Sequence, residues 1–282
     1  MSRRTTLIIL IILLAAILAI ILLRTNRTAL TASISDRPVN EPVPPLVIEY
    51  NNISDLFPLL PDSTPLIDYT GFTISYNEEY EQAAWVAYIL TRDEVLGGTE
   101  DRSENFRVDT LIETNSASPA DYARSGYDRG HLAPAADMKW SPSAMSESFL
   151  MSNMSPQLPG FNRGVWSRLE AKVRDWAVEN DSILVITGPV LGGISDYIGS
   201  NRVGVPKAYF KVIADISPPD YKVIAFLLQN QSSSADLFTF AVPVDSVEKV
   251  TGYDFFYILP DQEMIGRMEL RSNLSGWRRI ER

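Results

Sequence analysis

The sequence contains no cysteine. Disulfide bonds and cysteine-ligated metal centres are therefore excluded, but no cellular compartment is identified, because an oxidising compartment permits disulfides without requiring them. Histidine is almost as scarce, since His131 is the only one in 282 residues. A metal centre built from several histidines is thus excluded. Any acid/base step near neutral pH has His131 as its first candidate, because only an imidazole has an ordinary pKa in that range.

An excess of positive charge is also missing. The formal net charge is −10 and the isoelectric point is about 4.7. Because a polyanion is repelled at long range by such a surface, the protein as a whole does not present a nucleic-acid-binding face, and any such function needs a local basic cleft. Length and composition, with 45% hydrophobic and 21% charged residues, suit one large domain or two small ones.

An apolar segment, Leu7 to Leu23, follows Arg3 and Arg4 near the N-terminus. Its length is at the lower limit for crossing a bilayer and exceeds that of an ordinary signal-peptide core. We therefore expect a single-pass membrane anchor with the rest of the chain outside the cytoplasm. The alternatives are secretion after cleavage near Ala32 and residence in the mitochondrial intermembrane space.

The chain divides into three predicted parts. Residues 1–27 form the N-terminal anchor, or signal peptide, residues 28–64 form a proline-containing linker, and residues 65–282 form the folded domain. Within the domain the pattern predicts α+β architecture, with a central, mainly antiparallel sheet flanked by helices. The predicted strands are 70–76, 83–91, 182–187, 208–214, 223–230 and 238–243, the helices are 142–151, 163–180 and 244–250, and 93–105 is a loop.

The stretch from Tyr127 to Glu170 gathers the residues that suit chemistry. On an extended strand, positions two apart project to the same face, so Arg129 and His131 are expected to point into one site. Gly130 between them allows a backbone or a bulky anion to approach closely. A lone histidine is more often structural than catalytic, and it is this neighbourhood that favours a functional role.

Three oxygen-bearing side chains follow. Asn153, Asn162 and Glu170 supply carboxamide and carboxylate groups, which suit a hard cation of the Mg²⁺ type. Asn162 stands at the start of a predicted amphipathic helix, and Glu170 lies about two turns further along it, so both can face the same side. The alternative is that Asn162 only caps the helix by accepting a backbone N–H.

The motifs DRGH at 128–131, SNxxPQ at 152–157 and FNRGxWxRLE at 161–170 resemble those of the DNA/RNA non-specific endonucleases of the ββα-metal superfamily, which include the mitochondrial endonuclease G type. The likeness extends roughly over residues 65 to 270. It implies a ββα-metal active-site element and metal-dependent hydrolysis of DNA or RNA phosphodiester bonds with little sequence specificity.

The resemblance also implies a role for individual residues. His131 would be the general base, and Asn162 the only direct protein ligand of a hydrated Mg²⁺, with Mn²⁺ or another divalent cation as the alternative. Glu170 would hold the water shell of the metal. Arg129 would bind phosphate.

Two assignments leave alternatives. Arg102 would be a second phosphate-binding residue, but Arg107 lies close by in the sequence and competes for this role. Asn153 would orient either His131 or the backbone of the site. The basic residues available for a cleft are Arg102, Arg107, Arg124, Arg129, Lys139, Arg163, Arg168, Lys207 and Lys211, and about half of them are expected to be ordinary surface charges.

Other function classes are weighed against the nuclease. A nucleic-acid-binding or scaffold protein that keeps the fold with little catalysis is the runner-up, and it is disfavoured because His131, Asn162 and Glu170 are all present. A serine hydrolase is disfavoured because the only histidine belongs to DRGH and no GxSxG occurs. The expected partners are DNA or RNA and a membrane, and a homodimer is left open.

Overall fold

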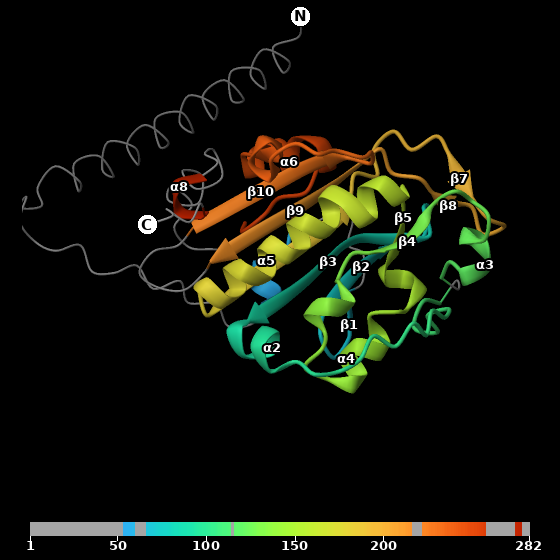
Figure 1. The fold of residues 1–282 in the computed structure, drawn as a ribbon. Coiled ribbons are helices and arrows are strands. Elements are labelled where there is room, and N and C mark those ends of the chain that lie inside the picture. The colour runs from blue at the N-terminus through green and yellow to red at the C-terminus, as the bar shows by residue number, and fades with distance from the viewer. Residues whose placement is uncertain (1–52, 60–65, 114–115, 216–221, 258–273, 278–282) are drawn as a thin grey trace, which may run out of the picture. The chain divides into compact units, whose positions relative to one another are not determined.

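The computed structural model describes residues 53–59, 66–113, 116–215, 222–257 and 274–277 (Figure 1). The predicted anchor, Leu7 to Leu23, lies outside these residues, as does most of the predicted linker. The part of the linker that is described begins with the short helix η1 (Ile53–Leu56), and Leu56 and Phe57 are buried. The boundary at residue 64 stays a prediction.

A seven-stranded sheet organises the described residues. Its strand order is β1-β2-β3-β6-β9-β10-β11, and every neighbouring pair is antiparallel. The strands are β1 (Leu66–Asp68), β2 (Thr73–Asn77), β3 (Gln82–Thr91), β6 (Ser182–Pro189), β9 (Ala208–Asp215), β10 (Lys222–Gln229) and β11 (Ala241–Val242). Two small ribbons accompany it, namely β4 (Asp128–His131) with β5 (Met154–Gln157), and β7 (Tyr197–Ile198) with β8 (Val203–Gly204).

Both faces of the central strands are buried, which explains their nearly continuous apolar sequences. Alternate residues enter different cores, because successive side chains of a strand point to opposite faces. In β3, for example, Val86 and Tyr88 belong to one core while Trp85 and Ala87 belong to the other.

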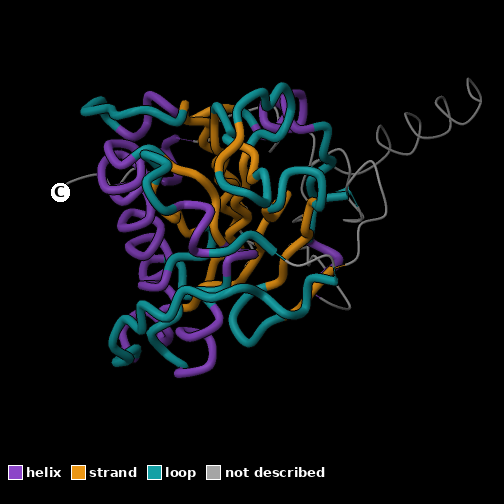
Figure 2. Tube along the Cα trace, turned by 90° about the vertical axis from the view of Figure 1, so that its right-hand side faces the viewer, coloured by secondary structure: helices purple, strands orange, loops and turns teal. Residues whose placement is uncertain are grey.

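Helices cover the two faces of the sheet (Figures 1 and 2). One core contains Val173 and Trp176 of α5 (Ser167–Glu179), and the other contains Val244 and Val247 of α6 (Val244–Thr251). The remaining described helices are α2 (Arg92–Gly97), α3 (Pro119–Tyr122), α4 (Pro142–Glu147), α8 (Leu274–Trp277), the 3-10 turns η2 (Ala135–Asp137), η3 (Met151–Asn153) and η5 (Leu237–Phe240), and the π-helical turn η4 (Phe161–Trp166).

The connection between β3 and β6 carries the elements that matter for function. These two strands are neighbours in the sheet, yet the chain between them, residues 92–181, forms the β4–β5 ribbon, η4 and α5 before it returns. The ribbon followed by a helix is the ββα order that the family resemblance implied. The prediction of an α+β fold with a mainly antiparallel sheet is confirmed.

Two local predictions were wrong. The first part of the expected loop, residues 93–97, belongs to the helix α2, because Thr91 and Glu94 make a reciprocal capping box in which each side chain bonds the other's backbone N–H. The expected strand 238–243 is mostly the turn η5 followed by the short β11, since Asp236 caps that turn by accepting from the Phe238 N–H at 2.9 Å.

No helix among the described residues is long and apolar enough to cross a membrane. The longest, α5, has 13 residues and carries charged side chains on its outer side, whereas a membrane span needs about 20 predominantly apolar residues.

Candidate active site

The β4–β5 ribbon presents Arg129 and His131 on one face, as the sequence predicted for positions two apart. The guanidinium carbon of Arg129 lies 3.9 Å from the centre of the Phe106 ring. The same ring packs edge-on against the imidazole of His131, with 5.7 Å between centroids. Phe106 therefore joins the two predicted site residues.

Gly130 has a different neighbour from the one expected. A Cβ at this position would lie 2.2 Å from the side chain of Gln157, which is fully buried on the paired strand. Glycine is needed here because Gln157 packs over the ribbon, and not because an anion approaches the backbone.

His131 sits in an aromatic box. Phe106 and Phe149 both contact the imidazole edge-on, the second at 4.9 Å between centroids, and only 7% of the residue is exposed. The ring is hydrogen bonded to the backbone carbonyl of Arg129, whereas Nε2 has no hydrogen-bond partner. The bonded nitrogen is therefore Nδ1, which donates its proton to the carbonyl, and this leaves the Nε2 lone pair unused.

Burial is the main influence on the pKa of His131, which it lowers to about 3, and the nearby charges of Arg102 and Arg129 act in the same direction. The hydrogen bond to the Arg129 carbonyl opposes them. The imidazole is consequently neutral at physiological pH, the state in which it can accept a proton.

The structure separates the two candidate arginines of the upstream loop. The guanidinium carbon of Arg102 lies 4.9 Å from the centre of the Phe149 ring, and its Nε is bonded to Glu104. Arg107 instead donates to the backbone carbonyl of Ser146 at 2.8 Å. The first arginine thus borders the aromatic box, while the second fastens the end of α4.

Asn153 fixes the backbone that follows His131. Its amide donates to the carbonyls of Ala133 at 2.9 Å and Ser148 at 2.8 Å, and its Oδ1 accepts the Ala133 N–H at 2.9 Å. All of its side-chain hydrogen bonds go to backbone groups. Of the two roles implied for Asn153, the geometry favours that of a support for the backbone of the site.

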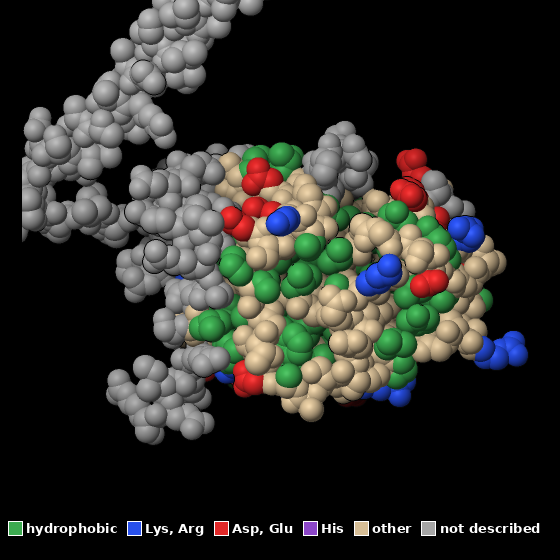
Figure 3. Space-filling view, turned by 90° about the horizontal axis from the view of Figure 1, so that it is seen from above, with side chains coloured by type: hydrophobic (Ala, Val, Ile, Leu, Met, Phe, Trp, Pro, Cys, Tyr) green, Lys and Arg blue, Asp and Glu red, His purple; other side chains and the backbone are tan. Residues whose placement is uncertain are grey.

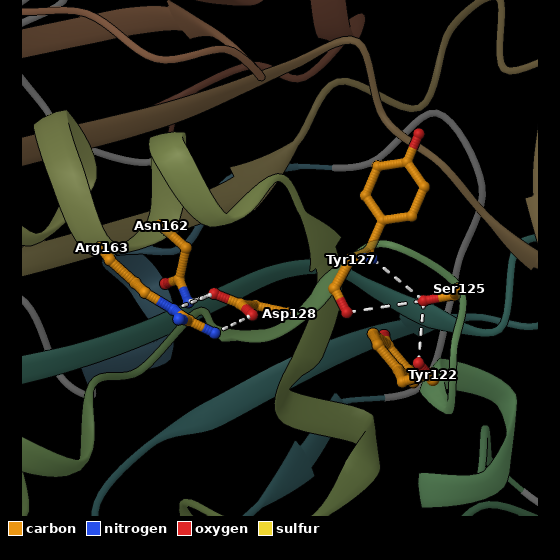
Figure 4. Close-up of polar contacts among 6 residues, drawn as sticks. All are labelled: Tyr122, Ser125, Tyr127, Asp128, Asn162 and Arg163. Carbon is orange, nitrogen blue, oxygen red and sulfur yellow. Dashed lines mark hydrogen bonds and ion pairs between the residues drawn. The ribbon is translucent and has the colours of Figure 1, made fainter.

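Asn162 is held by Asp128, the first residue of β4. Its Nδ2 donates to Asp128 Oδ2 at 3.0 Å, and Arg163 donates to both oxygens of the same carboxylate, at 2.8 and 2.6 Å (Figure 4). A carboxylate only accepts hydrogen bonds, so the amide nitrogen must face Asp128 and Oδ1 is directed to the other side. Although burial favours the neutral acid, the hydrogen bonds from Arg163 and Asn162 hold the pKa of Asp128 below its ordinary value.

Asn162 does not cap a helix. The residue at the cap position of η4 is Gly160, which makes no side-chain bond, and the helix is interrupted by the non-helical angles of Gly164. The turn before β4 is held by Ser125. Its hydroxyl accepts the Tyr127 N–H at 3.1 Å and donates to the Tyr122 carbonyl at 2.9 Å (Figure 4).

The oxygen donors suit a divalent cation. Within the described part of the chain, no hydrogen bond occupies Asn162 Oδ1 and no hydrogen bond or ion pair engages the Glu170 carboxylate. Glu170 lies in the first turn of α5 and is partly exposed. The amide oxygen of Asn162 and the carboxylate of Glu170 are therefore available as oxygen ligands, the type that Mg²⁺ or Mn²⁺ binds.

Several expected cleft residues are engaged elsewhere. Lys211 is fully buried, Arg163 is bonded to Asp128, and Arg168 donates to the carbonyls of Ser233 and Ala235. Lys139 borders a cavity of about 670 Å³ between α2 and α5 that His131 does not line. On the face shown in Figure 3, hydrophobic and uncharged atoms predominate, and both basic (Lys, Arg) and acidic (Asp, Glu) side chains are scattered among them. Among the described residues, Arg102 and Arg129 are the basic groups whose charges act on the imidazole.

Three residues of the site escaped the sequence prediction. Asp128 belongs to DRGH, and its acceptor-only carboxylate was a signal for a hydrogen-bonding role. Phe106 and Phe149 had no local signal, because aromatic residues in such segments are usually core. Only the tertiary contacts with His131 single them out.

Comparison with known proteins identifies the family. The sequence profile of the family described as DNA/RNA non-specific endonuclease matches residues 57–262. The chain belongs to this family. Human mitochondrial endonuclease G is 34% identical over 211 residues, which cover 70% of this chain and 71% of that protein. A nuclease of Nostoc is 32% identical over 241 residues, with 77% and 86% covered.

A solved structure is similar as well. It is the crystal structure of the EndoG/EndoGI complex, with a TM-score of 0.66 and 32% identity over 75% of this chain and 91% of that chain. The mitochondrial nuclease of Saccharomyces cerevisiae is 34% identical, and the match covers 67% of this chain and 64% of the yeast protein. Family membership and the nuclease names of these relatives support a nuclease that acts on nucleic acid.

The localisation prediction is contradicted. The expectation was a single-pass anchor with an extracytoplasmic domain, whereas the similar human and yeast proteins are named as mitochondrial nucleases. An apolar run with flanking arginines is shared by several kinds of targeting segment, so the pattern alone does not distinguish an anchor from other signals.

Proposed function

We propose that the protein is a divalent-metal-dependent endonuclease that hydrolyses phosphodiester bonds of DNA and RNA with little sequence specificity. One observation carries the proposal: Nε2 of His131 has no hydrogen-bond partner, and each of the two phenylalanine rings that contact the imidazole also supports a guanidinium. A proton acceptor beside two phosphate-binding groups is what phosphodiester hydrolysis requires.

His131 acts as the general base. Its Nε2 takes a proton from a water molecule whose oxygen attacks the phosphorus, and the bond from phosphorus to the 3′ oxygen breaks. Such proton transfer typically contributes a factor on the order of 10² to 10⁴. The hydrogen bond from Nδ1 to the Arg129 carbonyl keeps Nε2 as the accepting nitrogen.

Arg129 and Arg102 bind the phosphate and its developing negative charge. Each guanidinium lies over a phenylalanine ring, so its position is restrained before substrate arrives, which favours electrostatic stabilisation of the transition state. Because these contacts reach phosphate and not base edges, they give little sequence specificity. They also provide local positive charge on a chain of net charge −10.

Asn162 and Glu170 would hold the divalent cation, the first directly through Oδ1 and the second through water molecules. A bound cation supplies charge neutralisation at the phosphate and at the departing oxygen. Asp128 fixes the side chain of Asn162 in the orientation that this requires. Asn153 keeps the backbone after His131 in place.

The test is incubation of the protein with closed circular plasmid DNA and with RNA across a series of divalent cations. Conversion of the plasmid to nicked and linear forms shows internal cleavage, since a closed circle has no ends. His131→Ala, folded as judged by circular dichroism, should be slower by a factor on the order of 10² or more. Full activity of the wild-type protein in excess EDTA, or of His131→Ala, contradicts the proposal.

A further inference from the structure

Asp109 is a buried carboxylate that the proposed mechanism does not use. Only 1% of the residue is exposed. Its Oδ2 accepts hydrogen bonds from the hydroxyls of Tyr69 and Ser152, and its Oδ1 accepts the Leu111 N–H at 3.0 Å. Because a carboxylate removed from water is stable only with such donors, these three bonds define its position.

Two segments of the chain, residues 106–109 and residues 149–152, lie side by side and run in the same direction. The backbone N–H and carbonyl of Arg107 are both hydrogen bonded to the second segment, at 3.3 and 2.9 Å, in an isolated parallel bridge. The bond from Ser152 to Asp109 joins the far ends of the two segments. Neither segment belongs to the seven-stranded sheet, so their alignment depends on local bonds of this kind.

The near ends of the two segments carry the walls of the box around His131. Phe106 and Phe149 occupy matching positions, with 4.9 Å between ring centroids, and both rings contact the imidazole. Arg129 lies over the first ring and Arg102 over the second. A slip of one segment along the other would therefore change the distance between the imidazole and a guanidinium.

The second segment also leads directly to the backbone that follows His131. Ser152 is followed by Asn153, whose carbonyl accepts the Leu132 N–H at 3.0 Å, in addition to the side-chain bonds to the backbone described above. Ser152 thus stands between the buried carboxylate of Asp109 and the residue that supports the histidine strand.

We propose that Asp109 is a positioning residue for His131 and the two arginines. By holding Ser152, it keeps the segment of Phe149 in register with the segment of Phe106. The inference rests on the proposed function, in which the imidazole and both guanidiniums act on one phosphate. Reaction rates are sensitive to displacements of about 1 Å in such an arrangement, so the alignment of the two segments matters for turnover.

Two substitutions test the proposal, because each removes one hydroxyl that donates to the same oxygen, Asp109 Oδ2. Ser152→Ala releases the second segment from Asp109 and should lower kcat by about tenfold or more. Tyr69→Phe is the matched control. Tyr69 lies between β1 and β2, a turn that carries no residue of the box, and stacks on Phe72 with 4.8 Å between centroids. Loss of its hydroxyl should leave kcat within about twofold of the wild type.

Nuclear magnetic resonance gives a second readout that needs no activity. His131 is the only histidine, so its imidazole resonances are identified without ambiguity in protein labelled at histidine. Because two phenylalanine rings contact the imidazole, their ring currents influence where its proton resonances fall. Ser152→Ala should move these resonances, whereas Tyr69→Phe should leave them in place.

The proposal is overturned if Ser152→Ala keeps either the kcat or the His131 resonances of the wild type, or if Tyr69→Phe changes them as much. Ser152→Cys, in which a weak S–H donor replaces the hydroxyl, should lie between the wild type and Ser152→Ala in both measurements. It takes the place of Ser152→Ala if that variant does not fold. A wild-type protein that lacks nuclease activity, but whose His131 resonances respond in this way, would refute the proposed function alone.

Discussion

Asp128 Oδ2 accepts the side-chain amide of Asn162 at 3.0 Å, which joins the first residue of the DRGH strand to the residue proposed to bind the metal. The two positions lie on different elements, β4 and η4. Because the carboxylate can only accept, it sets which end of the amide faces the site.

The Asp128–Asn162 bond predicts a metal-binding defect on mutation. Asp128→Ala should lower activity by about 10-fold to 100-fold at limiting Mg²⁺, with partial recovery at high Mg²⁺, because residues that orient a ligand tune metal affinity. Activity measured over a Mg²⁺ titration checks this. Arg163→Ala is the control, since Arg163 shares the carboxylate but its side chain is 73% exposed, and it should have a much smaller effect. Equal defects in both variants would show that Asp128 acts by another route.

The proposed metal-binding role of Asn162 is tested by substituting it and by exchanging the residues at positions 128 and 162. Asn162→Ala should abolish activity at ordinary Mg²⁺, and Asn162→Asp should retain little, because the new carboxylate faces Asp128 and repels it. The exchanged variant Asp128→Asn with Asn162→Asp restores a donor–acceptor pair and a hard oxygen ligand. It should therefore be more active than Asn162→Asp alone when cleavage rates are compared. A lower activity would rule out this orientation of the amide.

The upstream arginines should separate into one that serves catalysis and one that serves stability. Arg102→Ala should lower kcat/KM by about tenfold or more while the melting temperature stays near that of the wild type, because Arg102 borders the box around His131. Arg107→Ala should chiefly lower the melting temperature, since it removes the bond to the Ser146 carbonyl. Steady-state kinetics and thermal melts of both variants test this assignment. A loss of kcat/KM in Arg107→Ala together with a loss of stability in Arg102→Ala would assign phosphate binding to Arg107.

His131 makes stability depend on pH. Its pKa is about 3 in the folded state and 6.5 ordinarily, so between these values the unfolded chain binds a proton that the folded chain does not. The free energy of unfolding should therefore fall as pH falls below about 6.5, by up to about 1.4 kcal/mol per pH unit from this group. Glu170 acts with the opposite sign, because its pKa is raised on folding.

Comparison with His131→Gln isolates the histidine, since Glu170 contributes to both proteins. Urea unfolding in the absence of divalent cations, from about pH 7 to about pH 4.5, should give a flatter pH dependence for the variant. Parallel curves for the two proteins would mean that the pKa of His131 is the same in the folded and the unfolded chain, which contradicts the lowered value.

The sequence by itself determined the features that depend on local periodicity. Alternation along a strand placed Arg129 and His131 on one face, and apolar spacing predicted α5 and the strands β3, β6, β9 and β10. These succeed because the geometry of a strand or helix fixes where nearby side chains project. Even so, the helix α2 was missed, although the Thr91 and Glu94 pair that caps it stands in the sequence.

Only the tertiary structure decided what depends on residues far apart in the chain. Phe106 and Phe149 meet at His131, Asp128 reaches Asn162, and Arg102 rather than Arg107 borders the imidazole. The sequence predicted Lys211 as a candidate cleft residue, whereas it is fully buried, with its Nζ 4.9 Å from the centre of the Trp166 ring of η4. Whether a lysine on a strand is buried or exposed depends on the elements that pack over that strand, and these come from distant parts of the chain.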